Sequence, residues 1–216
     1  EVTNDGKTLT LKNNSDYNIS GIVILDNREN ELGIRSVYHI DSLSSQNENQ
    51  LSIASQNIDD SFTFKSYEGY LSFAKARIIK ELVESGLFED EANAMVGTWE
   101  KGYFKTKGIR VLYVLSRQET DEILHIEISP TPKKLVRTLV GRVEVLSPED
   151  EAATENFIEN LLSFGAIPTQ INGREMTGLG HFPEPKLQRL LQTSKNEKVI
   201  KKAKEIIQTM NRGMIN

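Results

Sequence analysis

The sequence contains no cysteine and no long apolar run. Without cysteine there are no disulfide bonds, no thiolate metal ligands and no thiol nucleophile. No apolar run approaches the roughly 20 residues that a membrane helix needs. The 26 basic residues are outnumbered by 31 acidic ones. The resulting net charge of −5 argues against a nucleic-acid-binding protein, which normally carries a basic surface. We therefore expect a soluble globular protein that does not bind nucleic acid.

Signatures of common enzymes are also missing. The chain has neither a Gly-x-Ser-x-Gly elbow nor a His-Glu-x-x-His helix motif. Gly173, Gly178 and Gly180 do not form a phosphate loop, because no Gly-Lys-Ser/Thr ending follows them and no strand directly precedes them. The sequence thus gives no reason to expect a cofactor or a bound metal.

The hydrophobic pattern changes near Tyr67, and this change suggests how the chain is divided. Before it, short β-prone runs alternate with turn formers such as Asn13–Asp16, which predicts consecutive hairpins and a small antiparallel β-sandwich. We expect a β-rich domain over residues 1–66, a central α+β domain over 67–165, and a loop with a helical pair over 166–216. No Gly/Ser/Pro linker follows the first domain, so it should lean on the second and unfold with it.

Two helical stripes begin the central domain. Leu71, Ala74, Ile78 and Leu82 lie three and four residues apart, and a second stripe ends near Trp99, so a helical hairpin is expected. We expect Trp99 to pack this hairpin against a sheet.

Three strand-like runs follow the hairpin and predict a mixed or antiparallel sheet. They cover residues 109–115, 124–128 and 139–146, and the middle run alternates apolar and polar residues. Ser116 with Glu119 and Ser147 before a proline predict helix starts, and a short helix is expected over 131–138. With a basic helical pair near the C-terminus, the fold class is α+β.

Several segments of the central region resemble a group of uncharacterised, exported bacterial proteins. They are EAxAMxxTW at 91–99, GIRVLYVL at 108–115, TD at 120–121, PTP at 130–132, VR at 136–137 and VGRVE at 140–144. The resemblance implies a β-rich region before this block, short helices after it, and an extracytoplasmic location, either periplasmic or envelope-associated. It implies no catalytic residue.

His125 and Glu127 are the candidate catalytic pair. They lie two residues apart on a predicted strand and so project from one face, and the fold would have to bring His39 or His181 to them. A histidine beside a carboxylate can exchange protons or hold a metal, which would suit a hydrolase. The alternative is that both side chains simply belong to the solvated face of the sheet.

Four arginines are candidate ligand-binding residues because guanidinium groups bind carboxylates and phosphates in a fixed geometry. They are Arg110, Arg117, Arg137 and Arg142, with Glu119, Asp121, Glu127 and Glu144 as the acids that would otherwise pair with them. Structural ion pairs are the expected role.

The β-rich front, the missing catalytic signatures and the resemblance together favour a non-enzymatic, extracytoplasmic binding or scaffolding protein. Its expected partner is another protein or an envelope component. Two alternatives stay open: a hydrolase that uses a His/Glu pair, and a cytoplasmic adaptor that presents the basic C-terminal helices. The acidic run from Glu149 to Glu159 is a potential internal counterpart of that basic surface.

Overall fold

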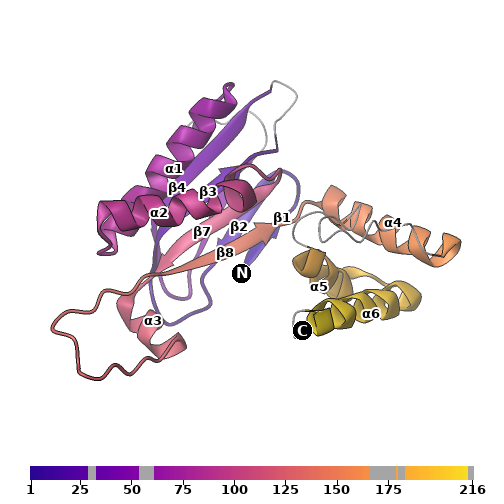
Figure 1. The fold of residues 1–216 in the computed structure, drawn as a ribbon. Coiled ribbons are helices and arrows are strands. Elements are labelled where there is room, and N and C mark those ends of the chain that lie inside the picture. Colours follow the sequence, from indigo (N-terminus) through magenta and orange to yellow (C-terminus); the bar gives the residue numbers. More distant parts are fainter. Residues whose placement is uncertain (29–32, 54–60, 166–178, 180–182, 214–216) are drawn as a thin grey trace. The chain divides into compact units, whose positions relative to one another are not determined.

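The computed structural model describes residues 1–28, 33–53, 61–165, 179 and 183–213. The chain divides into two compact units, Glu1–Val145 and Leu146–Asn216. The described residues form two antiparallel sheets and six α-helices (Figure 1). The predicted α+β fold class is therefore confirmed.

The first unit contains both sheets. The smaller has the strand order β1-β2-β5 and is built from β1 (Val2–Asn4), β2 (Thr8–Lys12) and β5 (Glu48–Ser52). The larger has the order β6-β4-β3-β7-β8 and is built from β6 (Ser61–Phe64), β4 (Arg35–Leu43), β3 (Ile19–Asp26), β7 (Ile109–Leu115) and β8 (Leu139–Val145). All pairings in both sheets are antiparallel.

The larger sheet is covered on both faces, and β3 shows how. Ile22 and Ile24 belong to a core that they share with Leu9 of the smaller sheet. Val23 and Leu25 alternate with them and belong to a second core, which they share with the helices. The unit therefore has three layers, small sheet, large sheet and helices, and β3 is apolar on both sides because it lies in the middle layer.

A helical hairpin forms the third layer. It comprises α1 (Tyr67–Glu84), α2 (Glu89–Trp99) and a π-helical segment, η1 (Glu100–Phe104). The predicted stripe of α1 is confirmed, since Ala74, Ile78 and Leu82 are buried. Trp99 packs against the core that contains Leu112 of β7, as expected, and its ring stacks on another aromatic ring of this hairpin.

The connection from β7 to β8 begins as predicted and then departs from the prediction. The helix α3 (Arg117–Ile123) follows a capping box in which the Ser116 hydroxyl accepts from the Glu119 amide at 3.2 Å. The predicted strand over residues 124–128 and helix over 131–138 are both wrong, because residues 124–138 form no regular element. Residues 139–145 form β8 and pair with β7, whose other edge pairs with β3, so residues 124–128 have no free edge of β7 to pair with.

The sequence predicts three segments, and the structure groups the residues into two compact units. The large sheet crosses the expected boundary at residue 66, because β3 pairs with β7. The amino-terminal strands thus lean on later strands, in agreement with the absence of a linker. The boundary between the two compact units falls after Val145.

The second unit is helical in its described part. It consists of α4 (Pro148–Phe164), α5 (Pro183–Thr193) and α6 (Glu197–Gly213). The Ser147 hydroxyl caps α4 as predicted by accepting from the Asp150 amide at 3.1 Å. Ile158 of α4 is buried in one core with Leu187 and Val199 of the helical pair, so α4 belongs with these helices. Among the described residues no helix has the length and apolar character needed to cross a membrane.

Candidate functional site

The predicted pair of His125 and Glu127 lies on the irregular connection, not on a strand. The side chains are 78% and 90% exposed, and His125 Nε2 is 3.3 Å from Glu127 Oε1. His39 lies on β4 and makes its contacts elsewhere, whereas His181 lies outside the described residues. Within the described part of the chain, no three His, Asp or Glu side chains are arranged to hold a metal ion.

The four candidate arginines separate into two pairs with different surroundings. Arg110 and Arg142 share Glu144 within the sheet, whereas Arg117 and Arg137 share Asp121. Both acids were among the expected partners.

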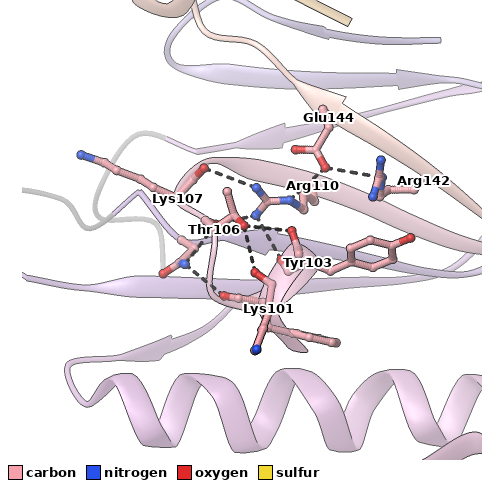
Figure 2. Close-up of polar contacts among 10 residues, drawn as sticks. Lys101, Tyr103, Thr106, Lys107, Arg110, Arg142 and Glu144 are labelled. Atoms are coloured by element: carbon pink, nitrogen blue, oxygen red, sulfur yellow. Dashed lines mark hydrogen bonds and ion pairs between the residues drawn. The ribbon is translucent and has the colours of Figure 1, made fainter. Parts of the chain in front are cut away.

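Arg110 is buried and bonded to the main chain around it (Figure 2). Its side chain is 1% exposed, and its Nε donates to Glu144 Oε1 at 2.9 Å. Its Nη1 donates to the carbonyl oxygen of Tyr103, in the π-helical segment, at 3.1 Å and to that of Thr106, just after the segment, at 2.6 Å. The guanidinium thus ties the helical hairpin to β7 and β8, which is a structural role.

Arg142 completes this group from the neighbouring strand. Its Nε lies 3.5 Å from the same Glu144 oxygen, and its guanidinium lies over the ring of Tyr103, 4.5 Å from the centroid (Figure 2). Cation–π contacts of this kind are favourable. These two arginines therefore satisfy internal partners and do not form an open anion site.

Arg117 and Arg137 form a clamp on the irregular connection. Arg117 Nε is 2.5 Å and Arg137 Nη1 2.7 Å from opposite oxygens of Asp121. Arg117 also donates to the carbonyl of Leu135, and Arg137 donates to the carbonyl of Leu124. Since Arg117 and then Arg137 stabilise the charged carboxylate, the pKa of Asp121 lies below its ordinary value. The clamp fastens both ends of the loop between Leu124 and Leu135.

The clamped loop is apolar and exposed. We call residues 123–136, which are the last residue of α3 and the connection after it, the apolar loop; Figure 1 shows this connection projecting from the sheet beside α3. Of the nine large hydrophobic side chains that are exposed in the described residues, five lie on it. They are Ile123 at 61%, Leu124 at 49%, Ile126 at 49%, Ile128 at 41% and Val136 at 38% exposure. Scattered exposed apolar residues are ordinary, but a concentration of them makes this loop the candidate interaction site.

The loop also leaves its main chain available. Among the described residues, no hydrogen bond is made by the main-chain groups of residues 125–128. Their side chains alternate, since Ile126 and Ile128 are about half exposed and the intervening Glu127 is 90% exposed. This arrangement suits an added β-strand, which binds through main-chain hydrogen bonds and alternate side chains.

A second polar site joins α1 to the large sheet, and the sequence indicated only one of its members. His39 Nε2 lies 3.1 Å from Glu81 Oε1, and Arg77 Nε lies 3.3 Å from the same oxygen. Gly21 makes room for this carboxylate, since a Cβ there would lie 2.6 Å from Glu81 Oε2. The group borders a pocket of about 260 Å³ that is also lined by Asp41, Lys80 and Glu84.

Sequence reasoning missed this site because its parts are distant in the chain. His39 was considered only as a partner for His125, and no short motif joins it to helix α1. The i,i+4 spacing of Arg77 and Glu81 on the helix was the available signal. The register that brings α1 over β4 was not readable from the sequence.

The basic C-terminal helices pair in part with the acids of α4. Arg189 Nε lies 2.7 Å from Glu151 Oε1, and Ser194 donates to Glu155 Oε1 at 2.6 Å. Asn196 likewise donates to Glu159 Oε1 at 3.2 Å. The contact between Arg189 and Glu151 thus pairs one basic residue with the acidic run, whereas Ser194 and Asn196 are neutral, and the alternative of a basic docking surface stays open.

Comparisons with known proteins return no relative. No protein-family model, no curated protein and no solved structure matches this chain.

Proposed function

We propose that this chain is a non-enzymatic binding or scaffolding protein that engages another protein chain through its apolar loop. The observation that carries the proposal is the gathering of five exposed apolar side chains on one clamped loop. A partner that covers this apolar surface stabilises the complex, because each Å² removed from water contributes about 25 cal/mol.

The clamp supports the proposal because it limits the cost of binding. Asp121 and its two arginines fix the loop at the carbonyls of Leu124 and Leu135. Loops held on a rigid scaffold often carry binding functions, and a loop whose ends are already fixed loses less entropy when it binds.

The unpaired main chain of residues 125–128 indicates the chemistry of the partner. A strand edge of another protein would supply the missing main-chain hydrogen bonds and an apolar face for Ile126 and Ile128. A protein strand would cover both the unpaired main chain and the apolar side chains, so it is favoured over a small molecule.

The resemblance to exported bacterial proteins supports an extracytoplasmic location for this binding protein. Fractionation of cells that naturally make the protein tests this location. Recovery in the periplasmic or envelope fraction is expected, and recovery in the cytoplasm alone would refute it.

The binding proposal is tested by site-specific photo-crosslinking in the same cells. A photoreactive side chain in place of Ile126 should give a discrete protein adduct, whereas one in place of Leu162 should not. Leu162 is a matched control because it is an aliphatic side chain with 42% exposure on α4. The adduct should diminish in Asp121→Asn, which weakens the clamp. Equal yields at both positions would refute the proposal.

A second candidate function is acid–base hydrolysis at the pocket beside α1. It is favoured by one observation, the 3.1 Å separation of His39 Nε2 and Glu81 Oε1, because a histidine beside a carboxylate is a common general base; Arg77 Nη2 also contacts both ring nitrogens of His39. The test is a hydrolase substrate panel with His39→Asn and Glu81→Gln. Activity lost in both variants, while both stay folded, would favour an enzyme; activity unaffected by either would exclude this pair.

A further inference from the structure

The apolar loop contains a segment that is complementary to itself. Residues 124–128 read Leu-His-Ile-Glu-Ile. If two copies run antiparallel and are centred on Ile126, Leu124 lies opposite Ile128 and His125 lies opposite Glu127. Ile126 then lies opposite Ile126 of the other copy.

We propose that two copies of this chain associate by pairing residues 124–128 as antiparallel β-strands centred on Ile126. This inference rests on the proposed function and names the partner, which is a second copy. The pairing is isologous, as in most two-fold dimers, so each copy uses the same residues.

Each face of the paired strands is complementary. On one face, Leu124, Ile126 and Ile128, each 41–49% exposed in the single chain, form a continuous apolar ladder with their counterparts. On the other face, each imidazole meets a carboxylate, and such cross-strand pairs are favourable. His125 Nε2 already lies 3.3 Å from Glu127 Oε1 within one chain, which shows that these side chains can share a face.

Charge selects this register over its neighbours. A shift by one residue places apolar side chains opposite polar ones. A shift by two places His125 opposite His125, or Glu127 opposite Glu127, and like residues that carry charge repel when directly opposite. Only the register centred on Ile126 pairs the histidine with the glutamate and keeps the apolar face continuous.

The contact is small, which sets the expected affinity. Five residues from each copy are far fewer than the roughly 20–30 a side found in stable complexes. We therefore expect a dissociation constant of about 10 µM or weaker, with dimer visible only at high concentration.

Cysteine crosslinking of the purified full chain tests the register. Because the chain has no cysteine, each variant carries a single thiol. Ile126→Cys should form a disulfide-linked dimer, since directly opposite residues have Cα atoms roughly 4.5–5.5 Å apart. His125→Cys should crosslink much less, because its own counterpart is a diagonal neighbour roughly 7–8 Å away. Leu162→Cys is the control for random collision.

Sedimentation tests the chemistry of the pairing. His125→Glu places carboxylates opposite each other and should weaken association at least about tenfold. Exchanging both residues, His125→Glu with Glu127→His, restores the unlike pairs and should restore the dimer. Ile126→Asp should abolish association, and Leu162→Asp should not change it. Because residues 125–127 are exposed, circular dichroism should show these variants folded.

The results separate this inference from the proposed function. Crosslinking at residue 126 no greater than at 125 or 162, or no recovery in the exchanged variant, would overturn self-pairing. If the purified chain is then monomeric but residue 126 still gives a heterologous adduct in cells, the binding function stands and only self-pairing fails. If residue 126 gives no adduct in cells and no dimer in solution, both proposals fail.

Discussion

Replacing the buried guanidinium of Arg110 with an uncharged chain of similar length should strongly destabilise the first unit. In Arg110→Met, the 10% exposed side chain of Glu144 loses its 2.9 Å partner, and the carbonyls of Tyr103 and Thr106 lose their donor. Breaking a buried ion pair by removing one partner costs about 3–5 kcal/mol. Arg142 remains 3.5 Å from the carboxylate, so we expect the lower end, about 3 kcal/mol.

Urea unfolding followed by tryptophan fluorescence measures this effect. Trp99 is the sole tryptophan and lies in the first unit, so its signal reports on that unit. With a slope of about 2 kcal/mol per M, the midpoint should fall by about 1.5 M.

The control is Arg117→Met. Arg117 is 50% exposed, and an exposed ion pair is worth under about 1 kcal/mol. The double variant Arg110→Met with Glu144→Leu should recover part of the lost stability, because the carboxylate that Arg110 neutralises is then removed as well. Equal midpoints for the two single arginine variants would refute the assignment of Arg110 as a structural tie.

Three further predictions follow from local geometry. Gly21→Ala should lower the free energy of unfolding by about 1–2 kcal/mol, because φ is 58° and the new Cβ would lie 2.6 Å from a carboxylate oxygen of α1. The control is Gly6→Ala, which has open space around it and should lower the thermal denaturation midpoint less. Hydrogen bonds from Lys105 and Lys75 lower the pKa of Glu100 from 4.5 to about 2. The contribution of Glu100 to stability is therefore full above pH 4.5 and is lost as pH falls through 2. By urea unfolding, Glu100→Gln should be less stable than the native chain at pH 7, and the difference should shrink steadily as pH falls toward 2. Residues 67–216 alone should show no cooperative change in Trp99 fluorescence in urea, because the fragment lacks β3; a sharp transition at the native midpoint would show that the amino-terminal strands are dispensable.

Local sequence signals correctly predicted several features of both units. The α1 stripe and the caps at Ser116 and Ser147 appear in the structure as predicted. Such features depend on residues within one or two helical turns of each other, so the sequence contains all the information they need. The same holds for β7, whose apolar run reflects burial on both faces.

The segment 124–128 shows where local pattern is insufficient. Its alternation is typical of a strand, yet both edges of β7 are occupied by β3 and β8, and the segment pairs with no strand of the described residues. The pattern therefore indicates that the segment can form a strand, but it does not indicate whether a neighbouring strand is available to pair with it.

The sequence by itself determined the α+β class, the positions of the main helices, the capping residues and the candidate arginines. Only the tertiary structure decided that Arg110 is buried while Arg117 and Arg137 clamp a loop, and that His39 meets Glu81. These outcomes depend on which strands pair and which helix covers which face. Such choices are set by packing between residues far apart in the chain, and no local period or propensity encodes them.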